Sequence, residues 1–157
     1  MTFTTHIFVG AAIGSLMPNP WLAFLAGLVT HHLLDLIPHI DEGTYIDKKG
    51  FRQKKFGPVA IVALETIIAS AMLAYVIWQS QPDQWLKLTA GALGGTLADL
   101  AHNVPFWSGY LKKKPVFKQW FWLHDKMHGR LYRSQWLIGV VSQGAIIVLA
   151  LLVLVYQ

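Results

Sequence analysis

The chain has 157 residues, of which 54% are hydrophobic and only 13% are charged. Soluble domains carry about 25% charged residues, so this composition indicates an integral membrane protein, with residues 1–157 forming a single domain. The formal net charge of +5 is concentrated in two short stretches beside apolar segments. That placement favours cytoplasmic membrane flanks over nucleic-acid binding. The absence of cysteine excludes disulfides and leaves nitrogen and oxygen atoms as the ligands for any metal.

Apolar segments follow one another along the chain and predict an all-α bundle of about five membrane-spanning helices. They cover residues 6–17, 21–38, 57–78, 85–104 and 136–156. A span needs ~20 residues, so the last three are long enough. The first two predict a shorter hairpin, either spanning or re-entrant, that turns at Pro18-Asn19-Pro20. The first segment follows no lysine or arginine, so we interpret it as mature protein rather than a secretory signal.

The basic residues predict the orientation of the bundle. Nearly all of them lie in residues 40–56 and 108–134, so both stretches should be cytoplasmic. The N-terminus is then cytoplasmic and the C-terminus lies outside. Within the second stretch, residues 116–131 are rich in aromatic side chains and predict an interfacial helix over the bundle. The apolar stripe expected for this helix consists of Trp120, Leu123, Met127 and Leu131.

A shift of 64 residues aligns two parts of the chain, about 6–39 with 70–103. Eight identities fall in nineteen positions, beginning at Pro18 with Pro82 and including Asp35 with Asp99. Coincidence within apolar sequence of low complexity is one explanation. A duplicated helical hairpin is the other, and it would place the two aspartates in equivalent positions near the interface of the repeats.

Histidine and aspartate pairs recur at spacings that share one helix face: His31 with Asp35, Asp99 with His102, and His124 with His128. Polar groups beside a span cost several kcal/mol by order of magnitude, so they are expected to be functional, and helical bundles build metal sites in this way. The predicted orientation puts every histidine on the cytoplasmic side. The predicted metal ligands are His6, His31, Asp35, Asp99, His102, His124 and His128. A simple hydrogen-bonding role at the headgroup level is the alternative.

Two further carboxylates are candidates for a general base or for a supporting role beside the ligands. Glu65 is nearly alone in its span, and Asp125 lies between two predicted ligands. His39 falls in the loop after the second span, where a solvated role is at least as well supported.

The predicted ligand set suits a divalent ion, with zinc as the first choice and manganese, iron or magnesium as alternatives. Such ions promote displacement at phosphorus, and a site at headgroup level indicates a phospholipid or polyprenyl phosphate as the substrate. Motifs of serine hydrolases, P-loop proteins and zinc proteases are absent from the sequence. The sequence therefore predicts a metal-dependent hydrolase of a lipid phosphoester. A cation or proton transporter and a non-catalytic membrane adaptor are the alternatives.

The chain resembles a family of small bacterial inner-membrane proteins called membrane-bound metal-dependent hydrolases. Residues 5–10, Thr-His-Ile-Phe-Val-Gly, resemble that family's opening Thr-His-x-x-x-Gly, and residues 30–35 resemble its Ser-His-x-x-x-Asp element. Residues 98–102 resemble a Pro-Asp-x-Asp-His element without its proline and second aspartate. Residues 124–128 resemble a His-Arg-x-x-x-His element, with Asp125 for arginine and one residue fewer. The resemblance implies a bound metal, hydrolysis and an inner-membrane location, but no particular substrate.

Overall fold

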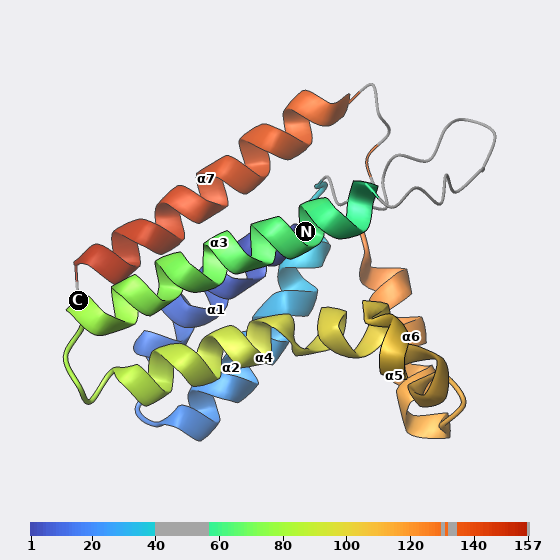
Figure 1. The fold of residues 1–157 in the computed structure, drawn as a ribbon, viewed down its shortest axis with the longest axis horizontal. Coiled ribbons are helices and arrows are strands. Elements are labelled where there is room, and N and C mark those ends of the chain that lie inside the picture. The colour runs from blue at the N-terminus through green and yellow to red at the C-terminus, as the bar shows by residue number, and fades with distance from the viewer. Residues whose placement is uncertain (40–56, 130, 132–134, 157) are drawn as a thin grey trace.

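The computed structural model describes residues 1–39, 57–129, 131 and 135–156, and in these residues it is all-helical, with no strand (Figure 1). The helices are α1 (Phe3–Ser15), α2 (Pro20–Asp35), α3 (Gly57–Gln79), α4 (Trp85–Asn103), α5 (Pro105–Leu111), α6 (Pro115–Met127) and α7 (Trp136–Val155). Each of the five predicted apolar segments is helical. The expected interfacial segment contains a helix, α6, and the short α5 was not expected.

Local sequence explains where the helices begin and end. The side chain of Asn19 caps α2 by accepting a hydrogen bond from Leu22 N at 2.9 Å, and Pro20 takes the first helical position, where no N–H is needed. Helix α4 ends at Asn103 because Val104 is extended, as residues before a proline generally are. Helices α5 and α6 also begin with proline.

Glycines bring the backbones of α1, α2 and α4 into direct contact. A Cβ atom at Gly10 would lie 2.4 Å from the carbonyl oxygen of Gly91, and one at Gly27 would lie 2.2 Å from the same oxygen. A Cβ atom at Gly95 would lie 2.5 Å from the carbonyl oxygen of His6. No larger residue fits at these positions without moving a helix, so the glycines fix the separation of the three helices.

Helices α3 and α7 pack against α1 and are otherwise largely exposed (Figure 1). By length and composition, α7 is able to cross a membrane: most of its 20 residues are apolar, and few are buried within the molecule. Helix α1 and residues 63–79 of α3 are apolar but shorter. One candidate span is therefore supported among the described residues. The five-span arrangement and its orientation remain predictions.

The face of α6 that is buried within the molecule is not the predicted apolar stripe, which stays a prediction for contact with a membrane. Leu123 is 42% exposed, whereas Phe121 and His124 are buried. The buried face is thus displaced by one residue, which is ~100° around a helix. The reason is the partner surface: the Phe121 ring stacks on His102 of α4, with 4.8 Å between ring centroids, and His124 enters a polar cluster.

Candidate metal centre

The glycine contacts place polar side chains at one end of the α1–α2–α4 core. Each of these helices carries a predicted ligand one turn from a contact glycine, and the pairs are His6 with Gly10, His31 with Gly27, and Asp99 with Gly95. Side chains one turn apart share a helix face. The surface that brings the backbones together therefore also turns the ligands toward one another.

Asp35, at the end of α2, is the centre of the resulting cluster, and its side chain is buried. Imidazole nitrogens surround its two oxygen atoms: His6 Nε2 and His31 Nε2 at 3.2 Å, His128 Nδ1 at 3.4 Å, His124 Nε2 at 3.6 Å and His39 Nε2 at 3.9 Å. The ammonium group of Met1 lies 2.5 Å from Asp35 Oδ1. One carboxylate therefore faces five imidazoles and an amine.

Asp99 of α4 supplies a second carboxylate to the same cluster. Its Oδ1 lies 3.5 Å from His124 Nε2, and its Oδ2 lies 3.9 Å from His6 Nε2. His6 and His124 consequently lie between the two aspartates. This arrangement agrees with the prediction that Asp35 and Asp99 serve one site, while the duplication itself stays a prediction.

Backbone carbonyls orient two of the imidazoles. The Nδ1 atom of His31 lies 2.7 Å from the carbonyl oxygen of Gly95, and the Nδ1 atom of His39 lies 2.7 Å from that of Ile37. A carbonyl oxygen only accepts, so both Nδ1 atoms carry the proton and both Nε2 atoms present a lone pair to the cluster. Metal-binding histidines are commonly held in this way. Burial, followed by the Met1 ammonium, lowers the pKa of His39 to about 4, so its ring is neutral near pH 7.

Several buried polar atoms of the cluster make no hydrogen bond of good geometry among the described residues, although most of them lie within ion-pair distance of a neighbour. They are both ring nitrogens of His6, both of His124, Nε2 of His31 and Oδ2 of Asp35. Such atoms are costly to bury unless something satisfies them. Two ligands of one tetrahedral zinc, each ~2.1 Å from the ion, lie ~3.4 Å apart. The observed separations of 3.2 to 3.9 Å around Asp35 are close to that value, so the residues fit a metal ion.

Overlapping groups of potential ligands occur within the described residues, each with its ligand atoms within 4.8 Å of one another. The groups are His6–His31–Asp99, His31–Asp35–His124, Asp35–His39–His128 and His102–His124–Asp125. Because His31, Asp35 and His124 each belong to two groups, the cluster has enough ligands for one ion or for two neighbouring ions that share Asp35.

Four of the five predicted histidine ligands surround Asp35 and Asp99, and the fifth, His102, lies at the edge. His102 Nδ1 is 3.9 Å from Asp125 Oδ1, and Asp125 is also 4.0 Å from His124 Nδ1. The side chain of Asp125 is 54% exposed. Asp125 and His102 thus form the solvent-facing side of the cluster.

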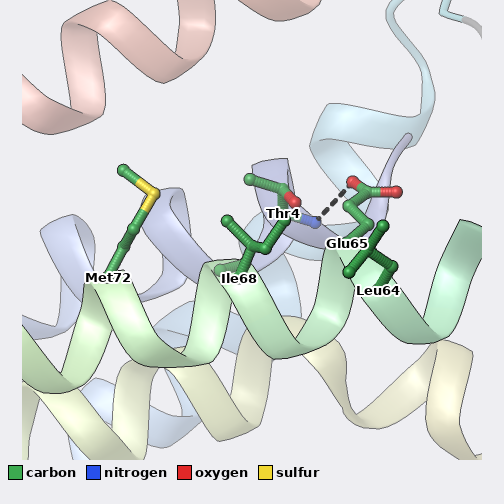
Figure 2. A pocket seen from close by; sticks show the side chains of 6 residues that line it. Thr4, Leu64, Glu65, Ile68 and Met72 are labelled. Carbon is green, nitrogen blue, oxygen red and sulfur yellow. Dashed lines mark hydrogen bonds between the residues drawn. The ribbon is translucent and has the colours of Figure 1, made fainter.

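Glu65 lies on α3, outside every ligand group found in the described residues. Its Oε1 atom accepts a hydrogen bond from Thr4 N of α1 at 3.2 Å. Figure 2 shows this contact at one end of an apolar groove that is also lined by Leu64, Ile68 and Met72, with a volume of about 280 Å³. Its predicted role as a base remains untested, and its observed contact joins α3 to the first turn of α1.

His39 is the cluster residue that the sequence did not assign to the site. It is 1% exposed, and its Nε2 atom lies 3.2 Å from His128 Nε2. The chain has left α2 by this point, so helical spacing could not predict the contact. The only signal was its distance of four residues from Asp35.

Hydrogen bonds hold the end of α6 against α2. Gly129 N donates to the carbonyl oxygen of Asp35 at 2.6 Å, and His39 N donates to the carbonyl oxygen of Gly129 at 3.3 Å. Trp120 Nε1 donates to His32 Nε2 at 3.1 Å. His32 therefore anchors α6 instead of joining the ligands.

Comparisons with family models, with curated proteins and with solved structures gave no match for this chain.

Proposed function

We propose that this chain is a membrane-embedded, metal-dependent hydrolase that cleaves a phosphoester of a lipid at the cytoplasmic surface. The observation that carries the proposal is the buried cluster of imidazoles around Asp35 and Asp99, several of whose ring nitrogens lie close to carboxylate oxygens without forming hydrogen bonds of good geometry among the described residues. A cluster that only stabilised the fold would satisfy its polar atoms, because unsatisfied buried groups destabilise a protein. The resemblance to membrane-bound metal-dependent hydrolases supports the same function.

The metal would be held by His6, His31, Asp35, Asp99, His124 and His128, with His39 as a further ligand. When bound, a divalent ion at such a site lowers the pKa of water and neutralises charge on phosphoryl oxygens. The carbonyl oxygens of Gly95 and Ile37 keep the rings of His31 and His39 in the orientation needed for binding. Helices α1, α2 and α4 exclude water from the inner side of the cluster.

Proton transfer is assigned to the exposed side of the cluster. Asp125 Oδ1 lies within 4.0 Å of His102 Nδ1 and His124 Nδ1 and is accessible to solvent. A carboxylate in this position can accept a proton from water and pass it to His102 or to the solvent. Glu65, which binds Thr4 N, would act by holding the first turn of α1, which carries His6.

A lipid substrate is favoured by the surroundings of the cluster. Helix α7 is able to span a membrane, and the α1–α2–α4 core exposes large apolar side chains, including Leu25 and Leu33. If the bundle spans with the N-terminus inside, the cluster lies near the inner headgroups. A phosphate at that depth would meet both the metal ligands and the lysines of the stretch 108–134.

The proposal is tested with detergent-purified full-length protein supplied with zinc or manganese. Three probes are used, namely phosphatidic acid, a polyprenyl phosphate and phosphatidylcholine, and release of phosphate or headgroup is measured. We expect turnover of at least one probe, loss of turnover after chelation, and no turnover by Asp35→Asn. The control Asp83→Asn changes an exposed carboxylate in the turn between α3 and α4 and should retain the activity. Metal binding without turnover of any probe would contradict hydrolysis.

A further inference from the structure

Helices α5 and α6 form a hairpin whose outer surface is unusually apolar for an exposed region. Phe106 is 92% exposed, Val116 75%, Tyr110 62% and Trp122 61%. Figure 1 shows the hairpin projecting beyond the end of α4, away from α3 and α7. The inner side of α6 is buried through Phe121 and His124, so the outer side is available to a partner.

Lysines are interleaved with these aromatic residues. Lys112, Lys113 and Lys114 occupy the turn between the two helices, and Lys118 and Lys126 are exposed on α6. The ammonium of Lys114 lies 4.8 Å from the centre of the Tyr110 ring, and that of Lys126 lies 4.7 Å from the Trp122 ring. Between residues 105 and 129 the only acidic residue is Asp125, which faces His102 and His124. The hairpin therefore carries a net positive charge, with five lysines against one aspartate.

We propose that this Lys–aromatic surface binds the anionic headgroups of phospholipids at the membrane interface. The surface consists of Phe106, Tyr110, Lys112, Lys113, Lys114, Val116, Lys118, Trp122 and Lys126. Aromatic rings and lysine stems favour the boundary between headgroups and acyl chains, and clustered lysines attract anionic lipids. Because the surface is positively charged, it should prefer anionic lipids such as phosphatidylglycerol over zwitterionic lipids. This binding requires no metal in the neighbouring cluster.

A lipid surface fits these residues better than a nucleic acid does. Phe106 and Val116 have the largest exposed fractions among the apolar side chains of the hairpin and gain free energy on leaving water for an apolar phase. Single-stranded nucleic acids use aromatic rings as stacking platforms, and an aliphatic valine offers no such face. The candidate span α7 follows α6 in the chain, so a membrane crossed by α7 would lie close to the hairpin.

The proposal is tested by measuring which lipid gathers at the hairpin. The chain has no cysteine, so Val116→Cys allows a single bimane label on the full-length protein. The protein is reconstituted in nanodiscs of phosphatidylcholine and phosphatidylglycerol, with brominated acyl chains on one lipid at a time. At equal mole fraction, we expect brominated phosphatidylglycerol to quench the label on the order of threefold more strongly, because each lysine near the surface favours anionic lipid. Since the attraction is electrostatic, 0.5 M NaCl should reduce the preference.

Matched variants distinguish the contribution of the hairpin lysines to the lipid preference from a general effect of the protein's net charge. Lys112→Gln/Lys113→Gln/Lys114→Gln should bring the two quenching values close to equality, whereas Lys87→Gln, near the other end of α4, should leave the preference unchanged. A label at Leu86→Cys, also at that end, should show no preference. Equal quenching at position 116, or a preference that survives both high salt and the triple substitution, would overturn the proposal. Protection of the label by an RNA oligonucleotide without phosphatidylglycerol preference would also overturn it.

Discussion

The inner and outer halves of the histidine cluster are built in different ways. The inner half, from α1, α2 and α4, rests on backbone contacts at glycines that admit no larger residue, and His6, His31 and Asp35 are each at most 1% exposed. The outer half comes from α6, which is buried only through Phe121 and His124. The geometry of the inner ligands is therefore fixed by helix packing, while that of the outer ligands depends on a few hydrogen bonds.

This difference indicates how the two halves should respond to substitution. Changes in the core should affect folding and metal binding together, because packing and ligand geometry share the same residues. Changes in α6 should weaken metal binding while leaving the core folded. The exposed carboxylate Asp125 also lies on the outer side, so a substrate is expected to approach the cluster there.

The largest effect is expected from adding a methyl group to the core. A Cβ atom at Gly91 would lie 2.1 Å from the carbonyl oxygen of Gly10, and only a shift of a helix can relieve this overlap. Gly91→Ala should lower the free energy of unfolding by about 3 kcal/mol and reduce metal content. The matched control is Gly144→Ala in α7. A Cβ atom added there would have no neighbour within 4 Å outside the backbone of α7, so this substitution should not destabilise the protein. Thermal unfolding in detergent compares the stabilities of the two variants. Equal unfolding midpoints for Gly91→Ala and Gly144→Ala would refute the packing account.

The zinc affinities of His31→Ala and His124→Ala compare the contribution of the core with that of α6. His31 is held by the Gly95 carbonyl and is buried in the core, so its position is fixed by helix packing. We expect its loss to weaken zinc binding on the order of 100-fold, and loss of His124 to weaken it on the order of tenfold. Competition with a zinc indicator gives both affinities. A larger effect for His124 would show that α6 holds the principal ligands.

His39→Gln and His102→Gln test which histidine beside the predicted set binds the ion. His39 is buried and close to Asp35 and His128, whereas His102 pairs with Asp125 at the edge. His39→Gln should weaken zinc binding about tenfold, and His102→Gln should change it by less than about threefold. The same titration measures both variants, and the reverse order would assign His102 to the metal.

The smallest effect is expected at the anchor of α6. Trp120→Phe removes the hydrogen bond to His32 Nε2 while preserving an aromatic ring. One hydrogen bond contributes about 1 kcal/mol, so α6 should loosen slightly without unfolding of the core. Hydrogen exchange should become faster in residues 115–127 and remain unchanged in α2 and α4. Faster exchange throughout the core would contradict the separation of the two halves.

Helix positions were largely predictable from sequence because apolar segments bounded by proline, asparagine and glycine have few alternatives. The convergence of His31, Asp35 and Asp99 was predictable for a similar reason, since helical spacing and the predicted orientation of the apolar segments constrained them. The contribution of His39 was not, because it depends on backbone hydrogen bonds between Gly129 and the end of α2. On the buried face of α6, the approach of His124 to the cluster was predicted but the burial of Phe121 was missed. Phe121 is buried because it stacks on the His102 ring, and hydrophobicity along α6 does not indicate this contact.

The central claim is most directly tested by elemental analysis of the purified protein by mass spectrometry. The protein should contain at least one equivalent of a divalent transition metal. Asp35→Asn and Asp99→Asn should each lose most of it, while Asp83→Asn should keep it. A protein without metal after purification and after incubation with zinc, or the same metal content in all three variants, would contradict the account.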